Sequence, residues 1–527
     1  MSDHGPRSHS DDEQIKRILE SIDAGADFAE DSDPAAQSEY DVTMTESGVT
    51  LTVGSPRDDE TPADDLEVEN VERIDIPVTD EDRAALSRVE AELNARASER
   101  EIDPSTEKIS LLLDFLGTPQ QTYKAIHVAG TNGKTSAVRM IGSLLGAFHR
   151  RVGYFVSPQL TSVTDTIGID GESIHPADFV RIYHEISSFI ELIDERYEVP
   201  LSKFEVLVAI AYAAFADAPV DVAVIETGMG GTWDATNVID ADVAVIMPVG
   251  LDHTDFLGET VAEIAEHKAG IIRNGDTVAI AAEQSPEAMN VVLRRAVEVG
   301  STVARFGTEF GVKESMVAVG GQTLALQGLG GIYDGLFLPV SGEHQAKNAA
   351  VALAAVEAFF GARADHQLNQ ESVRRGFAAV DIPGRLERVS AAPTTFVDAT
   401  HNPAGAQALA QALERDFNFT RLVGVVAILM DKDADGILRA LEPQLSEVVI
   451  TQNNSPRAYD AYELAEVARK IFGDERVHVE EHLPSAYNLA VELAGEDDAE
   501  AGTGVVFTGS VVTAGEAREL FGKDTHE

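Results

Sequence analysis

The sequence predicts an α/β fold in which parallel sheets are covered by helices on both faces. From about Glu81 onward, short runs rich in β-branched residues alternate with helix-length segments whose apolar residues recur at helical spacing. Strands of this continuous apolar character, separated by helices, are typical of parallel sheets buried on both faces. The runs on which this prediction rests are KAIHVAG, DVAVIETG, ADVAVIMPVG, TTFVDAT, VGVVAIL, EVVITQ and GVVFTGS.

Length and composition allow more than one domain. The chain has 527 residues, of which 44% are hydrophobic, whereas single domains usually contain roughly 100–200 residues. The predicted strands form two sets, separated by the alanine-rich helix NAAVALAAVEAFFG and then by DIPGRLE, whose Pro-Gly pair suits a joint between domains. We therefore expect a domain boundary near Val380, with one domain at residues 82–380 and a smaller one at residues 381–527.

The first 81 residues differ in composition from the rest of the chain. Residues 1–80 contain 23 acidic and 5 basic side chains, together with many Ser, Gly and Pro residues. Such a segment cannot bury enough apolar surface to offset the entropy lost on ordering, so we expect a disordered acidic tail at residues 1–81. One short apolar helix is expected within it, around Ile15 to Ile22. Partner binding is a second interpretation of this segment, and a solvated appendage is the simpler one.

Charge and the lack of cysteine argue against several functions. The 90 acidic and 40 basic residues give a formal charge of −50, which repels nucleic-acid phosphates and anionic lipid headgroups. With no cysteine in the chain, disulfides, thiol nucleophiles and thiolate-bound metals are excluded. The N-terminus lacks an apolar signal segment, and no uninterrupted apolar run reaches about 18 residues. We expect a cytoplasmic protein that binds neither nucleic acid nor membranes.

A glycine-rich loop lies between a predicted strand and a predicted helix. The strand Ala125–Val128 runs into AGTNGKTS and then into SAVRMIGSLLGAF, which has helical apolar spacing. In such a loop, backbone N–H groups converge on phosphate oxygens, Lys134 would neutralise the β- and γ-phosphates, and the Thr135 hydroxyl would ligate Mg²⁺. Val128 stands where the usual pattern has its first glycine, so a simple turn that caps the helix is the alternative. The predicted phosphate-binding residues are Gly130, Thr131, Asn132, Gly133, Lys134, Thr135 and Ser136.

A carboxylate, an imidazole and a lysine follow in the next segments. Glu226 ends the strand of DVAVIETG and His253 follows that of ADVAVIMPVG, and ligands of open α/β sheets bind beyond the carboxyl ends of the strands. Lys268 lies on a helix that we expect to pack toward the same edge. From the residues alone, a loop-capping glutamate, a structural histidine and a solvated lysine remain open, since Mg²⁺ prefers oxygen to imidazole. Asp252 and Asp255 are weaker metal candidates.

Seven motifs occur in an order that resembles one family. They are HVAGTNGKTS, ETGMGGTWDATN, GLDHTDFLG, HKAGII, GEHQAKNAA, PGRLE and DATHNPAG. In order and spacing they resemble the folylpolyglutamate synthase and dihydrofolate synthase family of the Mur-ligase superfamily, from roughly Asp82 to Phe521. The resemblance implies a P-loop Mur-ligase-type central ATPase domain with a mostly parallel sheet, followed by a smaller Rossmann-like C-terminal domain that carries the glutamate-ligase function.

The resemblance also implies roles for individual residues. The residues implied to contact ATP are Asn132, Gly133, Lys134, Thr135, Asn348, Arg385 and Asp398, and those implied to ligate Mg²⁺ are Ser157, Glu226 and His253. Lys268 resembles a family lysine that is carbamylated, a change that turns an ammonium group into an oxygen ligand for a second Mg²⁺. His401 would lie at the domain interface near the phosphates, and Phe204 and Glu205 would line a pteridine pocket. Without the resemblance, Arg385 reads equally well as an interdomain salt bridge and Asp398 as a strand-end cap.

The implied activity is the ATP-dependent addition of L-glutamate to a reduced folate, with dihydropteroate as a second acceptor, by a monomeric enzyme. Lys134, Lys268, Arg385 and His401 are the implied catalytic residues, and the γ-phosphoryl group of ATP would convert the carboxylate into an acyl phosphate. One alternative is a ligase acting on UDP-muramyl peptides, although HNPAG replaces its DNPR-like segment. The other is a nucleotide-binding homologue that has lost catalysis.

Four positions depart from the family pattern. Gln159 and Thr166 replace a histidine and a basic residue, Thr232 stands where an arginine follows GG, and His267 stands where a glutamate precedes the lysine. We expect these changes at the active-site edge, where they bear on substrate preference. Charged residues after later strands that offer further contacts for glutamate are Asp431, Lys432, Asp433 and Arg457.

Overall fold

The structure, a computed structural model, describes residues 40–45, 48–53, 77–96, 104–364, 366–495 and 502–523. The chain divides into two units, residues 1–77 and residues 78–527. In the first unit, β1 (Tyr40–Thr45) and β2 (Gly48–Val53) pair as an antiparallel hairpin. The helix expected around Ile15 to Ile22, like most of the acidic segment, lies outside the described residues.

The larger sheet of the second unit has eight strands in its described part. The strands from β10 to β4 run parallel, and β5 and β6 extend the β4 edge in antiparallel fashion. In spatial order the strands are β10 (Thr302–Arg305), β9 (Val278–Ala281), β8 (Val243–Ile246), β3 (Lys124–Ala129), β7 (Val222–Glu226), β4 (Val152–Phe155), β5 (Ile167–Ile169) and β6 (Glu172–Ser173).

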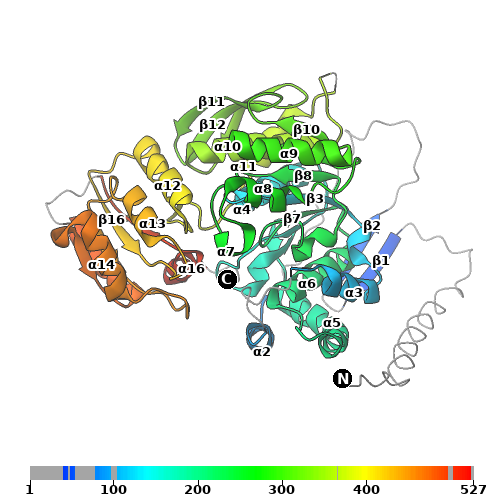
Figure 1. Ribbon diagram of the computed structural model, residues 1–527, viewed down its shortest axis with the longest axis horizontal. Helices are drawn as coiled ribbons and strands as arrows, with labels where there is room; N and C mark the ends of the chain where they lie inside the picture. Colours follow the sequence, from blue (N-terminus) through cyan, green and yellow to red (C-terminus); the bar gives the residue numbers. More distant parts are fainter. Residues whose placement is uncertain are drawn as a thin grey trace, which may run out of the picture. The chain divides into compact units, whose positions relative to one another are not determined.

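Both faces of this sheet are buried, which explains the continuous apolar runs. Successive side chains of a strand point to opposite faces, so Ile126 and Val128 join one core and Ala125 the other. Figure 1 shows α4 and α10 on one side of β7 and α5 and α6 on the other. The first face packs against α4 (Lys134–Ala147), α10 (Glu343–Phe359) and α11 (Gln370–Ala378). The second packs against α2 (Asp80–Asn94), α3 (Glu107–Phe115), α5 (Pro176–Arg196), α6 (Lys203–Asp217), α8 (Val261–Ala269) and α9 (Pro286–Val299).

A three-stranded antiparallel sheet was not expected from the sequence. It consists of β11 (Gly311–Ala318), β12 (Gly321–Gln327) and β13 (Ile332–Leu338). Its buried side chains, such as Leu324 and Leu336, pack on α10 and belong to the same core as α4. The alanine-rich helix α10 is therefore buried nearly all round, which accounts for its composition.

A second α/β lobe follows, built on a six-stranded sheet in the described residues. Its strands are, in spatial order, β14 (Glu387–Ala391), β15 (Thr394–Val397), β19 (Thr503–Thr508), β16 (Arg421–Val426), β17 (Glu447–Ile450) and β18 (Val477–Val479). Only β14 pairs in antiparallel fashion. One face is covered by α12 (Pro403–Asp416), α13 (Ala434–Leu441) and α14 (Ala461–Phe472), and the other by α15 (Leu483–Gly495) and α16 (Val511–Leu520).

The predicted α/β class with mostly parallel sheets is confirmed. Each of the seven runs identified in the sequence contains a strand, and these strands belong to two separate sheets. The strands of the first lobe, the part built on the eight-stranded sheet, all precede Val380, and those of the second lobe all follow it. The boundary near Val380 itself stays a prediction. Among the described helices, none combines the length and the apolar character of a membrane span.

Candidate active site

A cavity of about 1040 Å³ lies at the carboxyl ends of strands from both lobes. First-lobe residues reach it from the ends of β3, β4, β7 and β8, and second-lobe residues from the ends of β15, β16, β17 and β19. Ligands of open parallel sheets bind at this edge, so the cavity is the candidate active site. Nearly all the site residues expected from the sequence line it, and Glu205 is the exception.

The glycine-rich loop forms the floor of the cavity between β3 and α4. Gly130 approaches the next strand so closely that an added Cβ would lie 2.4 Å from the Met247 Cβ. Gly133 precedes α4 with a φ of 82°, in the left-handed region that favours glycine. The first turn of α4, which carries Lys134, therefore opens directly onto the cavity with unpaired backbone donors, as an anion site requires.

The Thr131 side chain and backbone hold the glycine-rich loop against the segment after β8. Its backbone N–H donates to the Pro248 carbonyl at 2.9 Å. The Thr131 hydroxyl lies 3.1 Å from the Gly250 carbonyl and 3.0 Å from the Gly250 nitrogen, as donor to the first and acceptor from the second. These hydrogen bonds fix the glycine-rich loop to the segment after β8.

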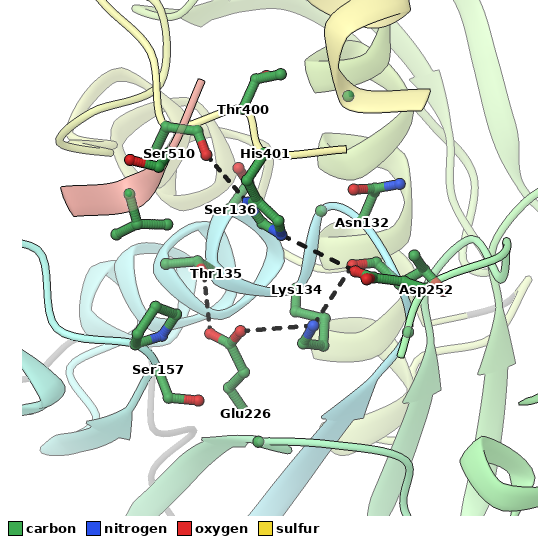
Figure 2. A pocket seen from close by; sticks show the side chains of 18 of the residues that line it. Asn132, Lys134, Thr135, Ser136, Ser157, Glu226, Asp252, Thr400, His401 and Ser510 are labelled. Carbon is green, nitrogen blue, oxygen red and sulfur yellow. Dashed lines mark hydrogen bonds and ion pairs between the residues drawn. The ribbon is translucent and has the colours of Figure 1, made fainter. Parts of the chain in front are cut away.

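Glu226 is a buried carboxylate at the end of β7, with 2% of its surface exposed. The Thr135 hydroxyl donates to its Oε2 at 2.9 Å, and the Lys134 Nζ lies 3.9 Å from its Oε1. Figure 2 shows Lys134 and Thr135 pointing toward this carboxylate. Burial raises the pKa of Glu226, and Lys134 and Thr135 partly oppose that rise. A cation placed beside Glu226 would stabilise its charged form.

Lys268, on α8, is buried beneath the glycine-rich loop, with 4% of its surface exposed. Its Nζ donates to the Gly130 carbonyl at 2.8 Å. Burial, and then the neighbouring Lys134, lower the pKa of Lys268 to about 7. A sizeable fraction of the amine is therefore neutral near neutral pH, and this is the nucleophilic form.

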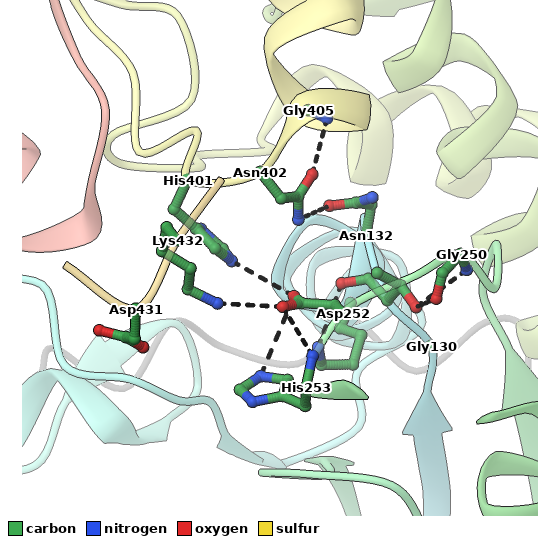
Figure 3. A network of polar contacts seen from close by, with 12 residues as sticks. Gly130, Asn132, Gly250, Asp252, His253, His401, Asn402, Gly405, Asp431 and Lys432 are labelled. Atoms are coloured by element: carbon green, nitrogen blue, oxygen red, sulfur yellow. Dashed lines mark hydrogen bonds and ion pairs between the residues drawn. The ribbon is translucent and has the colours of Figure 1, made fainter. Parts of the chain in front are cut away.

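Asp252 stands at the meeting point of the two lobes (Figure 3). Its Oδ1 accepts from the Lys432 Nζ at 3.0 Å, and its Oδ2 lies 4.0 Å from the His401 Nε2 and 3.9 Å from the His253 Nε2. Burial alone would raise the pKa of Asp252, but His253 and Lys432 outweigh it and hold the pKa well below its usual range. From its sequence context Asp252 is only a weak metal candidate, whereas in the structure it bridges the lobes.

Other expected nucleotide contacts come from α10 and the second lobe. Asn348, Arg385 and Asp398 line the cavity, and the Asn348 amide is held by Gln345 at 3.1 Å. Asp398 accepts the backbone N–H groups of Leu386 and Thr400, at 2.8 and 2.9 Å. The Asp398 carboxylate therefore caps the strand end, which was the alternative interpretation, and it does so while facing the cavity.

The structure separates the two residues expected in the pteridine pocket. Phe204 lines the cavity and packs against Gly228. Glu205 does not line it, which corrects the expected placement: its Oε2 accepts from the Ser202 N–H and hydroxyl, both at 2.8 Å, and lies 3.5 Å from the Lys108 Nζ. Glu205 thus completes a capping box at the start of α6.

The four departures from the family pattern fall into two groups. Gln159 and Thr166 line the cavity. The Lys203 Nζ donates to the Gln159 Oε1 at 3.1 Å, so the glutamine occupies a polar position on that wall. Thr232 and His267 do not line the cavity and instead pair with each other, since the Thr232 hydroxyl donates to the His267 carbonyl at 3.1 Å. Only the first pair can touch a substrate in this arrangement.

The charged residues that were further candidates for glutamate contacts also divide. Asp431, Lys432 and Arg457 line the cavity, and the Arg457 guanidinium lies 3.5 Å from the Asp431 carboxylate. Asp433 instead caps α13 by accepting from the Gly436 N–H at 2.9 Å. Asp255 is exposed and is not a lining residue.

The oxygen donors at the glycine-rich loop suit Mg²⁺. Thr135, Ser157 and Glu226 all line the cavity and offer two hydroxyls and one carboxylate. Mg²⁺ is commonly held by one or two protein carboxylates together with substrate phosphates. The described part of the chain contains no group of three or more His, Asp or Glu side chains arranged to hold a metal on its own. The donor set therefore fits a metal that arrives with a nucleotide.

Some lining residues had no signal in the sequence. Leu93, Asn94 and Arg96, from the end of α2, reach the cavity although α2 lies some 30 residues before the glycine-rich loop. The Asn402 amide donates to the Asn132 Oδ1 at 2.9 Å, which joins the lobes directly. The HNP motif drew attention to His401, but a contact between residues so far apart in sequence is not visible in the motif.

Two family models match the chain over most of both lobes. The model of the Mur ligase middle domain matches residues 128–356, and that of the Mur ligase glutamate ligase domain matches residues 384–511.

Named relatives and solved structures agree with these matches. Over 469 residues the chain is 53% identical to the dihydrofolate synthase/folylpolyglutamate synthase of Mycobacterium tuberculosis, covering 85% of this chain and 96% of the relative. It is 35% identical to the folylpolyglutamate synthase of Lacticaseibacillus casei, covering 67% and 82%. A structure of the M. tuberculosis folylpolyglutamate synthase complexed with ADP and AMPPCP has a TM-score of 0.80 at 53% identity, covering 84% and 99%. A structure of E. coli FolC in complex with DHPP and ADP has a TM-score of 0.71 at 29% identity, covering 83% and 97%.

Proposed function

This chain belongs to the folylpolyglutamate synthase and dihydrofolate synthase family of Mur ligases, and we propose that it uses ATP to join L-glutamate to the carboxylate of a reduced folate or of dihydropteroate. The observation that carries the proposal is the cavity shared by the two lobes, with the glycine-rich loop on one wall and charged second-lobe residues on the other. The enzyme acts as a monomer in the cytoplasm, with domains meeting near Val380.

The first step is phosphoryl transfer at the glycine-rich loop. A carboxylate oxygen of the pteroate or folate attacks the γ-phosphorus of ATP, the bond to the β–γ bridging oxygen breaks, and ADP leaves. Lys134 and the backbone N–H groups at the start of α4 hold the phosphates, because this chemistry depends mainly on positioning and charge stabilisation. Asn348, Arg385 and Asp398 contact the nucleotide from the other side.

The second step forms the amide bond. The glutamate amine loses a proton and attacks the acyl carbon, the bond from that carbon to the phosphate oxygen breaks, and inorganic phosphate leaves. Arg385 and His401 belong to the second lobe, so the catalytic set is complete only when the lobes are closed. Closure also keeps water from the acyl phosphate. Phe204 offers an apolar surface for the pterin ring, while Gln159 and Thr166 adjust the acceptor preference.

Mg²⁺ would be held mainly by oxygen donors around Glu226, with the His253 imidazole as a further ligand. We assign Thr135, Ser157, Glu226 and His253 to its coordination, with Lys268 serving a second ion once carbamylated. Bound with the nucleotide, Mg²⁺ neutralises phosphate charge and orients the γ-phosphoryl group. Carbamylation of Lys268 is supported by its burial and by its pKa of about 7, because a neutral amine adds to carbon dioxide. Labelled bicarbonate should give a carbamate NMR signal in the wild-type protein that Lys268→Ala lacks.

A phosphate-release assay with ATP, Mg²⁺ and L-glutamate tests the proposal. Phosphate should appear only when tetrahydrofolate or dihydropteroate is present, and the ratio of the two rates measures acceptor preference. A UDP-muramyl peptide should give no release. Release with that peptide alone would assign the chain to the other ligase branch, and nucleotide binding without release for any acceptor would indicate lost catalysis.

A further inference from the structure

One carboxylate, Asp252, lies close to polar side chains of both lobes. On the first-lobe side it faces its neighbour His253, and on the second-lobe side it faces Lys432 and His401. The Asp252 and Lys432 side chains are each 13% exposed, and their ion pair spans 180 positions of sequence. Removing one partner of a buried pair leaves an uncompensated buried charge, and this is strongly destabilising.

Asp252 is coupled to the glycine-rich loop through a short chain of hydrogen bonds. Thr131 binds Pro248 and Gly250, and Gly250 lies two residues before Asp252. These bonds join the glycine-rich loop to the segment that carries Asp252. A second link lies beside it, because the Asn402 amide donates directly to Asn132 of the same loop. Figure 3 shows the Asn402–Asn132 contact and, separately, the contacts of Asp252 with His401 and Lys432.

His401 is held on the second-lobe side of this junction. Its Nδ1 lies 3.1 Å from the Ala399 carbonyl, which can only accept, so Nδ1 carries the proton and Nε2 faces Asp252. Lys432 comes from a different loop of the same lobe, after β16. Two second-lobe loops are thus aligned on a single first-lobe carboxylate.

We infer that Asp252 and Lys432 are positioning residues whose ion pair docks the second lobe onto the glycine-rich loop and so places Arg385 and His401 over the phosphates. The inference deepens the proposed function and rests on it. Lys432 acts through Asp252 and does not itself bind glutamate. Through this pair, the position of the glycine-rich loop determines where the second lobe docks.

The test compares Lys432→Met, Asp252→Asn and the double variant in the full chain. Each single change should lower kcat by roughly tenfold or more, because one buried charge loses its partner. Affinity for an ATP analogue should fall less than kcat, since the glycine-rich loop is unaltered and only the second-lobe contacts to the nucleotide are lost. The kcat of the double variant should be no lower than that of the less active single variant, because both changes remove the same contact. Lys432→Arg should restore most of the rate.

A control for the loss of a lysine–aspartate pair removes an exposed lysine that has an aspartate partner outside the cavity. The Lys124 Nζ lies 2.7 Å from the Asp242 Oδ1 within the first lobe, and neither residue lines the cavity. Lys124→Met should leave kcat unchanged. Losses that multiply in the double variant, or an unchanged kcat in Lys432→Met, would overturn the inference. A rise in the KM for glutamate in Lys432→Met alone would overturn it too, because Lys432 would then be a direct glutamate ligand.

Small-angle scattering separates this inference from the proposed activity. With a non-hydrolysable ATP analogue, the wild type and Lys124→Met should have the same radius of gyration, while Lys432→Met and Asp252→Asn should have a larger one. This readout needs no folate. If the wild type forms no product, the proposed function fails while the scattering still decides the docking role. Equal radii for all four proteins would overturn that role.

Discussion

Two buried glutamates, Glu226 at the end of β7 and Glu357 on α10, are alike in burial and different in their surroundings. They are 2% and 0% exposed, and burial raises the pKa of both. Glu357 accepts from the backbone N–H groups of Leu329 and Gly330 and from the Tyr333 hydroxyl at 2.8 Å. It fastens α10 to the three-stranded sheet and lines no part of the cavity.

Glu226 has a hydroxyl and a lysine as side-chain partners, both from the first turn of α4 beside the cavity, and a backbone hydrogen bond from Ser157. The side-chain partners of Glu226 line the cavity, whereas those of Glu357 lie away from it. Burial and a raised pKa are therefore not enough to mark a functional carboxylate. The distinguishing feature is whether the side-chain partners of the carboxylate line the cavity.

The largest expected effect follows from removing the cation beside Glu226. Lys134→Ala should lower turnover by roughly 10²–10³-fold or more, because charge stabilisation of the transferring phosphoryl group is lost. The melting temperature should change little, since Lys134 adds no apolar contact to the core. A collapse of the melting temperature together with activity would place Lys134 in the same structural class as Glu357.

Glu226→Gln tests the functional carboxylate itself. We expect kcat to fall by about 10²-fold while the protein stays folded and no less stable, because the amide removes a charge whose burial is unfavourable. Steady-state kinetics and thermal melting measure the two quantities. A near-normal kcat would mean that Glu226 has no role in catalysis, and the two glutamates would then not differ in function.

Glu357→Gln should show the opposite pattern. The change weakens the bonds from Leu329, Gly330 and Tyr333, and leaving buried donors poorly matched costs about 1–3 kcal/mol of unfolding free energy. Below the melting transition, kcat should stay within about twofold of the wild type. Tyr333→Phe, which removes one of these bonds, should cost about 1 kcal/mol. Reduced kcat without reduced stability would mean that Glu357 reaches the site.

An effect that appears only on acidification concerns His127, a structural residue on the same strand that carries the glycine-rich loop. It is 0% exposed, its Nε2 lies 2.8 Å from the Thr236 hydroxyl, and burial lowers its pKa from 6.5 to about 3. Below pH 6.5 the unfolded chain binds a proton that the folded chain does not bind. Stability should therefore fall as pH drops from about 6.5 toward 3, by up to about 1.4 kcal/mol per unit.

Urea unfolding at several pH values should show this slope reduced in His127→Phe, whatever the variant's absolute stability. An unchanged slope would mean that His127 is protonated in the fold. The result would sharpen the contrast by showing that a buried titratable group on the cavity strand can be as purely structural as Glu357.

Local features of the chain explain why much of the site was predictable. The glycine-rich loop is contiguous, and the positions of Glu226 and His253 follow from the strand that each one follows. Other positions depended on distant partners. Glu205 is the instructive case: Ser202 and Glu205 have the spacing of a capping box, and that local signal describes Glu205 better than its supposed place in a pocket. Thr232 and His267 looked like active-site changes and instead pair with each other.

The sequence by itself determined the α/β class, the parallel strands, the glycine-rich loop between strand and helix and the family, because periodicity and contiguous motifs are properties of neighbouring residues. The tertiary structure alone decided which separate loops meet at the cavity, the addition of the three-stranded sheet on α10, and the pairing of Asp252 with Lys432 across 180 positions. Such contacts arise when cores pack and strand ends are brought to one edge, and no local pattern encodes a distance between segments that far apart.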